Sequence, residues 1–310
     1  MKKLIAVSCL LFFSCGQQTE FVRFSYPEGR YKAFILSYDD GTIQDIELAQ
    51  LFDQNNLIGT FNLNSKYLSV TRAWPQQNGD TIFQRYVPKD SLNWIYKNHE
   101  IAAHGALHQN FTDIDDAEVL KELQTDIEIL NALTQRTIES MAYPFGNTNE
   151  RVAALVASTP LINGRTVSDT HSFDLPTDFY RWNPSCHDSK ALPLMEEYLS
   201  LEPTELSVFY VWGHSWEFGN PQRWEDMKVL CKKMGQATDV WSVSMGAFSR
   251  YLMALERIVV DKNHITNPVD NGVVWIETNK GIQRLSPGQS LELDTPAYLL
   301  GLDGSEKVLR

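Results

Sequence analysis

The alternation of apolar and polar residues predicts strands and helices in turn along most of the chain. Residues 31–38 are rich in aromatic and β-branched types and form the first predicted strand. The further strand candidates are 57–64, 100–104, 138–143, 161–167, 206–212 and 240–243. Strands that alternate with helical stretches are typical of parallel sheets with helical crossovers. The pattern therefore predicts an α/β barrel or a doubly wound sheet.

The clearest helical pattern lies at 116–135, where Leu120, Leu123, Ile127 and Leu130 recur at the spacing of one buried helix face. A second helix is predicted at 43–54, directly after the first strand. Helices in these places are the crossovers that a parallel sheet requires.

Two segments interrupt the rhythm of strands and helices. Residues 65–90 form a long insertion with several aromatic side chains, which either contact the apolar faces of sugar rings or pack the loop onto the domain. Beyond residue 258 the helical pattern stops. Residues 259–310 are predicted to form a small antiparallel β unit, either a separate module or a cap on the barrel, and 31–258 form the α/β domain.

The N-terminus has the pattern of an export signal, with two lysines followed by a short apolar run in residues 1–14. This run is too short to span a membrane. Residues 11–15 resemble a bacterial lipobox, in which Cys15 becomes the lipidated first residue of the mature chain. A plain secretory signal is the alternative. Both place the protein outside the cytoplasm, with residues 15–30 as a tether.

Charge and cysteine content narrow the choice of partners. Removal of residues 1–14 leaves 25 basic and 39 acidic residues, a net charge of −14, which argues against nucleic acid as a partner. Cys186 and Cys231 remain in the mature chain. They form either one disulfide or two buried free thiols, and two cysteines do not make a thiolate metal site.

Side chains that bind metals follow two of the predicted strands. Asp39 and Asp40 end the first strand, and His104 and His108 follow the strand at 100–104. Histidines four residues apart share a helical face and can bind one metal ion together. With Asp40 they make a two-histidine, one-carboxylate set that suits Zn²⁺ and leaves a position open for water or substrate.

Two further features also follow strand candidates. Residues 142–146 form a turn shaped by proline and glycine, and His214 comes after the apolar run at 208–211. Taken alone, His214 would be a structural histidine at a strand end. However, the C-terminal ends of parallel strands meet on one face in barrels and open α/β sheets, so we expect these features to lie together.

The four motifs together resemble those of the polysaccharide deacetylases of carbohydrate esterase family 4. The similarity extends over residues 31–257 and implies a distorted (β/α)7 barrel followed by the β-rich extension. It also implies roles for individual residues. Asp39 matches the catalytic base, Asp40 the metal-binding aspartate, and His104 and His108 the metal-binding histidines.

The third motif and the last motif of the family supply the remaining roles. His214 matches the general acid, and the turn at 142–146 matches the segment whose backbone, at Tyr143, steadies the oxyanion. The third motif usually begins with an arginine that steadies the catalytic aspartate, and Ala142 stands there in this chain. We expect Arg181, which is flanked by aromatic residues, to supply the missing guanidinium, with Arg165 as its competitor.

The resemblance implies a hydrolase that uses Zn²⁺ or another divalent transition metal to remove acetyl groups from a glycan, with N-acetyl favoured over O-acetyl. One alternative is a glycan-binding lipoprotein that has lost the chemistry. Two departures from the family suggest it, namely Ala142 in the third motif and the lack of a clear aspartate–tryptophan motif after it, near residues 178–182. The other alternative is hydrolysis of a non-acetyl amide. His187 lies near residues 178–182 and either contacts substrate or, as the favoured interpretation, is a surface histidine.

Overall fold

The computed structural model describes residues 20–75, 80–261, 263–293, 297–300 and 306–308. The predicted export signal and Cys15 lie outside the described residues. Within them, no helix combines the length and the apolar character that crossing a bilayer requires.

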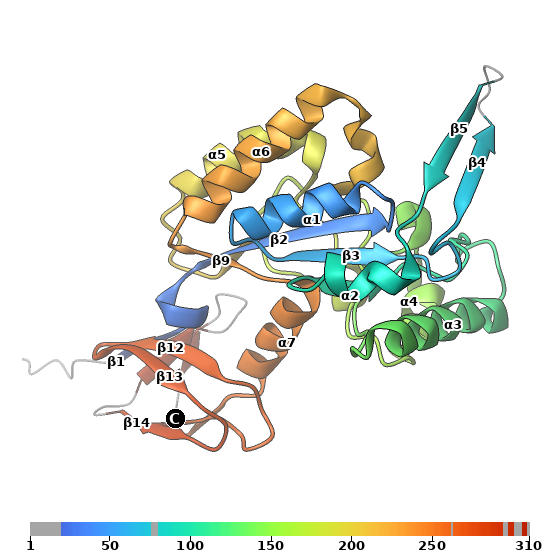
Figure 1. Cartoon of the computed structure of the whole chain (residues 1–310). Helices are drawn as coiled ribbons and strands as arrows, with labels where there is room; N and C mark the ends of the chain where they lie inside the picture. Colours follow the sequence, from blue (N-terminus) through green and yellow to red (C-terminus); the bar gives the residue numbers. More distant parts are fainter. Residues whose placement is uncertain (1–19, 76–79, 262, 294–296, 301–305, 309–310) are drawn as a thin grey trace, which may run out of the picture.

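A parallel sheet occupies the centre of the fold (Figure 1). Its strands, in spatial order, are β6 (Glu100–Ala103), β3 (Gly59–Leu63), β2 (Lys32–Asp40), β8 (Ser207–His214) and β7 (Cys186–His187), and β9 (Val240–Ser242) also pairs with β2. All of these pairs are parallel. The predicted α/β class is confirmed.

Strand β2 lies in the middle of the sheet, and both of its faces are covered. Phe34, Leu36 and Tyr38 pack into one apolar cluster, and Ala33 and Ile35 pack into another. Parallel strands that are buried on both faces have this nearly continuous apolar sequence. The two carboxylates at the end of β2 are thus delivered to the sheet edge by a well-anchored strand.

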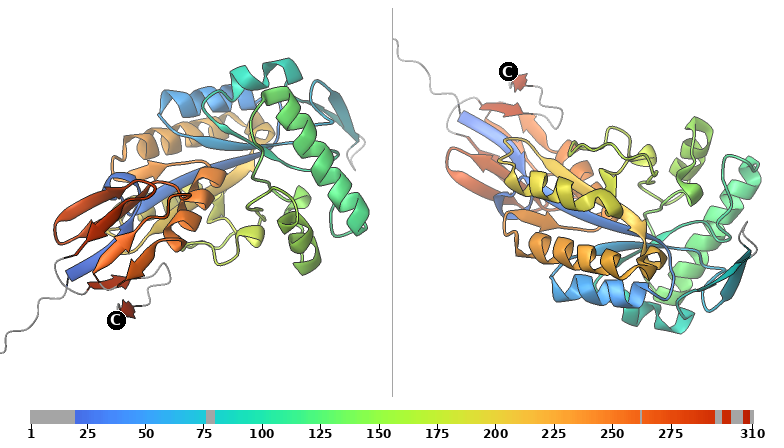
Figure 2. Two further views of the ribbon diagram at one scale, coloured as in Figure 1. Left: turned by 90° about the horizontal axis from the view of Figure 1, so that it is seen from below. Right: turned by 90° about the horizontal axis from the view of Figure 1, so that it is seen from above.

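Helices cover the sheet (Figure 2). They are α1 (Asp45–Gln54), α2 (Leu92–Ile95), α3 (Asp116–Thr134), α4 (Glu150–Ala157), α5 (Ala191–Ser200), α6 (Pro221–Gln236) and α7 (Met245–Glu256). Helices α5, α6 and α1 lie side by side, and α3 packs against α4. Asp115 caps the N-terminus of α3, because its side chain accepts a hydrogen bond from the backbone N–H of Glu118.

The described residues do not form a closed barrel of strands. The predicted strands at 138–143 and 161–167 are instead isolated parallel bridges, which link Ala103 to Met141, Ala142 to Arg165, and Arg165 to Trp182. The sheet therefore continues past β6 as single residue pairs. These pairs bring the 142–146 turn and Arg165 to the same edge as the end of β2.

The insertion at 65–90 is largely a β-hairpin. Strands β4 (Thr71–Pro75) and β5 (Thr81–Arg85) pair antiparallel and project from the body of the molecule (Figure 1). The hairpin is joined to the end of β2, because the Val87 N–H donates a hydrogen bond to the Gly41 carbonyl. Its attachment point therefore lies directly beside the paired carboxylates.

The prediction of a tether at 15–30 is wrong for its described part. Residues Glu20–Ser25 form β1, which pairs antiparallel with β12 (Val274–Thr278) and parallel with β15 (Ala297–Leu300). This sheet also contains β13 (Gly281–Leu285) and β16 (Glu306–Val308). The remaining strands, β10 (Val259–Asp261), β11 (His264–Thr266) and β14 (Ser290–Glu292), form a smaller sheet.

The C-terminal β strands share a core with the central sheet. Val22 of β1 and Ile276 of β12 belong to the same buried cluster as Ile35 of β2 and Tyr210 of β8. This packing favours a cap over a separate module. The cap lies at the opposite end of the molecule from the β4–β5 hairpin (Figures 1 and 2).

Of the two alternatives for the cysteines, the structure shows free thiols. Cys186 and Cys231 are both buried and unpaired with each other. Burial raises the pKa of the Cys186 thiol to about 12, so this side chain behaves as a small apolar residue in the core.

Candidate active site

The site begins at the C-terminal end of β2, where adjacent carboxylates take different environments. Asp39 is buried, and Asp40 is partly exposed. The backbone of Asp40 has a φ of 80°, an uncommon conformation for a residue other than glycine, and such outliers concentrate at functional sites.

Asp40 lies next to both predicted metal-binding histidines. Its Oδ1 atom is 3.7 Å from His104 Nε2 and 3.6 Å from His108 Nε2. In a tetrahedral zinc site with bonds of about 2.0–2.1 Å, ligand atoms stand roughly 3.3 Å apart. The three side chains, called here the Asp40–His104–His108 trio, therefore fit one metal ion after small movements.

The histidines of the trio are held in the form that binds metal. Burial lowers the pKa of both His104 and His108 to about 4, which leaves the imidazoles neutral. The Nδ1 atom of His104 lies 2.8 Å from the Ala142 carbonyl oxygen. A proton on Nδ1 satisfies this contact and frees Nε2 to act as a ligand, an arrangement that is common behind metal-binding histidines.

Helix α3 anchors the loop that carries the two histidines. Asp126 accepts hydrogen bonds from the backbone N–H groups of Ser65 and His104, at 2.8 and 2.9 Å, and Glu122 accepts one from the Leu107 N–H at 2.8 Å. These two carboxylates are one helical turn apart and face the same loop. They fix the spacing of the histidines through the backbone.

Asp39 is paired with a buried arginine. The Nη2 atom of Arg165 lies 2.5 Å from both carboxylate oxygens of Asp39, and the Arg165 side chain is 0% exposed. Asn62 donates a further hydrogen bond to Asp39 at 2.9 Å. Burial by itself raises the pKa of a carboxyl group, but the charge of Arg165, together with the neighbouring imidazoles of His104 and His214, outweighs it and lowers the pKa of Asp39.

The prediction that Arg181 replaces the missing motif arginine is wrong in its geometry. Arg181 forms an ion pair with Asp178 at 2.7 Å, and its side chain is 44% exposed. Its competitor Arg165 occupies the place beside Asp39. The reason is the parallel bridge between Ala142 and Arg165, which brings Arg165 to the next position along the sheet edge.

His214 approaches Asp39 from β8. Its Nε2 atom is 4.0 Å from Asp39 Oδ2, and its Nδ1 atom is 2.8 Å from Glu217 Oε1. Burial by itself lowers the pKa of an imidazole, but the hydrogen bond to Glu217 and the charge of Asp39 outweigh it, so the pKa of His214 is raised. The sequence analysis missed Glu217. A carboxylate three residues after His214 was the available signal, because residues that close in sequence can pair.

The prediction for Tyr143 is also wrong, because its backbone N–H is already engaged. It donates a hydrogen bond to the Arg165 carbonyl at 3.0 Å and belongs to the bridge that continues the sheet. Pro144 has no N–H, so Phe145 carries the next donor on the turn. Phe145 has a φ of 61°, which again marks a constrained position.

Two exposed aromatic side chains flank the trio, and the sequence analysis did not single them out. The Phe145 ring is 59% exposed and lies 4.5 Å from the His108 ring. Trp216 is 42% exposed, donates a hydrogen bond from Nε1 to Asp40 Oδ2 at 2.7 Å, and lies 5.1 Å from the His214 ring. Exposed rings on either side of a polar site suit the apolar faces of sugars.

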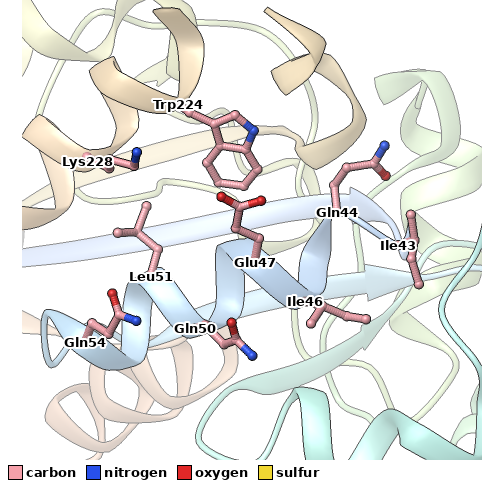
Figure 3. Close-up of a pocket in the computed structure, with 9 residues that line it drawn as sticks. All are labelled: Ile43, Gln44, Ile46, Glu47, Gln50, Leu51, Gln54, Trp224 and Lys228. Carbon is pink, nitrogen blue, oxygen red and sulfur yellow. The ribbon is translucent and has the colours of Figure 1, made fainter. Parts of the chain in front are cut away.

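A separate groove of about 690 Å³ lies between α1 and α6 (Figure 3). Trp224 and Lys228 enter it from α6, and Glu47 and Leu51 enter it from α1. Neither Asp39 nor any member of the trio lines this groove. The chemistry therefore lies at the sheet edge and outside this groove.

Residues 18–162 match the family model described as Polysaccharide deacetylase. The resemblance to the polysaccharide deacetylases is confirmed. The deacetylase match contains Asp39 and the trio, and it ends before Arg165 and His214. The family model therefore carries no information on these last two residues, and their geometry places them beside Asp39.

Solved structures of deacetylases resemble the chain at low sequence identity. A candidate polysaccharide deacetylase from Mycobacterium smegmatis is 17% identical with a TM-score of 0.55, and the match covers 75% of this chain and 93% of that one. A family 4 carbohydrate esterase from Streptomyces lividans, solved in complex with acetate, is 16% identical with a TM-score of 0.44, with 69% and 91% covered. The first likeness shows a shared fold. No curated protein sequence matches the chain.

Proposed function

We propose that the chain is a metal-dependent hydrolase that removes acetyl groups from a carbohydrate, with N-acetyl groups favoured over O-acetyl groups. The observation that carries this proposal is the convergence of the trio, Asp39 and His214 at one sheet edge. His104 and His214 each lie 4.0 Å from Asp39 Oδ2. The match to the polysaccharide deacetylases supports the same reaction class.

The trio would hold Zn²⁺, because two neutral imidazoles and one carboxylate are a donor set that zinc prefers. A bound metal would supply a Lewis acid that acidifies water and polarises the acetyl carbonyl. The partly exposed carboxylate of Asp40 and the half-buried His108 leave access for a substrate from the solvent side.

Asp39 would act as the general base. Its lowered pKa keeps the carboxylate ionised at neutral pH, and Arg165 and Asn62 hold it in one orientation. A base positioned in this way can accept the proton of the attacking water and contributes typically 10²–10⁴-fold to the rate. The buried Arg165 thus restores the guanidinium that Ala142 removes, which weakens one of the two grounds for a binding protein without activity.

His214 would act as the general acid. Its raised pKa favours the imidazolium, and Glu217 holds Nδ1 so that Nε2 faces the reacting groups. A leaving amine needs a proton more than a leaving alkoxide does, so this acid fits N-acetyl substrates better. The Phe145 N–H, in place of that of Tyr143, would donate to the developing oxyanion.

The experiment that tests the proposed function is acetate release from a panel of N-acetylated and O-acetylated glycans. The purified mature chain is loaded with one equivalent of zinc. We expect release from at least one N-acetylated glycan. Absence of release from every glycan, with zinc bound, would favour a binding protein or the hydrolysis of another amide.

Replacing Glu217 with glutamine is expected to shift the alkaline limb of the kcat/KM profile to lower pH. Glu217 raises the pKa of His214, and the protonated acid is lost as the pH rises through that pKa. Removal of the charge therefore makes activity disappear earlier on the alkaline side. The pH profile at one equivalent of zinc measures this, with the exposed Glu225→Gln as control. An unchanged alkaline limb would argue against the role of Glu217.

The localisation is proposed from the sequence alone. We infer that the chain is exported and lipid-anchored at Cys15, since residues 11–15 resemble a lipobox. Mass spectrometry of the mature N-terminus tests this proposal. A diacylated Cys15 is expected, and an unmodified residue at the cleavage site would indicate a plain secretory signal.

A further inference from the structure

A second group of side chains that bind metals lies beside His214, at the ring nitrogen that faces away from Asp39. The group consists of His187, His214 and Glu217. Each residue offers one ligand atom, and these atoms all lie within 4.8 Å of one another. The Asp40–His104–His108 trio shares no member with this group.

Glu217 is the centre of the group. Its Oε1 atom is 2.8 Å from His214 Nδ1, and its Oε2 atom is 3.4 Å from His187 Nε2. Two imidazole nitrogens thus face one carboxylate, and each lies within hydrogen-bonding distance of one of its oxygens. Two histidines and a glutamate are also a known zinc ligand set, and the separations are close to the roughly 3.3 Å expected between tetrahedral ligands.

The environment of His187 suits a metal ligand better than a free surface histidine. Its Nδ1 atom accepts a hydrogen bond from the Ser189 N–H at 3.3 Å and lies 2.9 Å from Ser189 Oγ and 3.2 Å from Asp188 Oδ1. Its ring contacts Trp212 at 4.7 Å between centroids. A metal bound at Nε2 would shift the ring proton to Nδ1, where the Asp188 carboxylate can accept it. The ring is thus already oriented toward Glu217.

The charges around the group determine how tightly it would bind a metal cation. Arg223 contacts Asp188 at 2.5 Å and Glu217 at 3.2 Å. With neutral imidazoles, two carboxylates face one guanidinium, so the net charge still attracts a cation. The nearby guanidinium weakens that attraction. We therefore expect binding weaker than that of the trio, whose Asp40 carboxylate forms its described ion pairs with the two metal-binding histidines.

We propose that His187, His214 and Glu217 form a second, weaker site for a divalent transition metal, and that occupation of this site inhibits the hydrolase. The reason for inhibition is the competition for Nδ1 of His214. A metal bound there takes the lone pair that holds the second proton of the imidazolium. The inhibition rests on the proposed role of His214 as the acid, whereas the binding does not.

The experiment that tests the binding is calorimetric titration of the metal-free chain with Zn²⁺. We expect two binding events in the wild-type chain, and only the tighter event in His187→Asn. Asparagine keeps a polar group near Ser189 and removes Nε2. His264→Asn, at an exposed histidine of β11, is the matched control and should keep both events. A single event in the wild-type chain, or a second event that persists in His187→Asn, would overturn the proposed site.

Acetate release over the same titration tests the inhibition. Wild-type activity should rise up to one equivalent of zinc and fall beyond it, whereas His187→Asn should reach a plateau. Two binding events without a fall in activity would overturn the inhibition and leave the site. If His187→Asn abolishes the second event but no variant releases acetate at any zinc level, the site stands and the proposed function fails.

Discussion

Replacing Asp39 with asparagine is expected to lower acetate release by about 10²–10⁴-fold while the chain keeps its metal. Asparagine has nearly the same shape as aspartate but cannot accept the proton of water. Asp39 contacts Arg165 and Asn62 and is not a member of the trio, so the metal ligands themselves are unchanged. The loss should appear in kcat more than in KM, because the substrate still binds.

The measurement is kcat and KM at one equivalent of zinc, with zinc affinity determined on the same samples. Asp178→Asn is the matched control, since Asp178 pairs with Arg181 away from the site. Activity of Asp39→Asn within a few-fold of wild type would remove Asp39 from the role of base. Loss of zinc together with activity would indicate that Asp39 supports the metal site instead.

Replacing Arg165 with methionine is expected to destabilise the metal-free chain by about 3–5 kcal/mol at neutral pH, the usual cost of breaking a buried ion pair. Arg165 is fully buried and bonds to both oxygens of Asp39. Without it, burial is no longer offset and the pKa of Asp39 rises. The charged carboxylate then costs most at neutral pH, and the cost shrinks as the pH falls and Asp39 takes up a proton.

Urea unfolding of the metal-free variants at neutral and mildly acidic pH measures this effect. Combining Arg165→Met with Asp39→Asn should recover part of the stability, because the unpaired charge is gone. Arg181→Met, at the exposed arginine, should leave the free energy of unfolding close to that of wild type. Equal effects of the Arg165 and Arg181 substitutions would contradict the assignment of Arg165.

Strongly patterned segments could be predicted from the sequence. Strand β2 is a long apolar run that is buried on both faces, and α3 has an apolar stripe and an N-terminal capping residue, so local pattern and tertiary environment agree. The segments at 138–143 and 161–167 could not be predicted in detail. Most of their apolar residues are buried, but the two segments form only single-residue bridges.

The candidate site likewise contains residues that could be predicted from the sequence and residues that could not. Asp40, His104 and His108 follow strands whose ends must meet, so their convergence follows from topology. The choice between Arg165 and Arg181 depends on a pairing 126 residues from Asp39 in sequence, and the aromatic neighbours of Arg181 carry no information on it. Whether the N–H of Tyr143 is free depends likewise on that bridge.

Strand β1, in the segment predicted to be a tether, could not be predicted for a different reason. From Val22 to Tyr26 apolar residues alternate with Arg23 and Ser25, which is a strand pattern, but the run is short and its antiparallel partner lies some 250 residues further along the chain. Pairings of this kind are fixed by tertiary contacts and leave only a weak local signal.

In the proposed function, hydrolysis requires a metal held by Asp40, His104 and His108. Acetate release from an N-acetylated oligosaccharide, before and after removal of the metal with a chelator, tests it most directly. We expect release to stop in the metal-free chain and to return on addition of one equivalent of Zn²⁺, whereas His108→Ala should not recover. Undiminished release from the metal-free chain would contradict the claim.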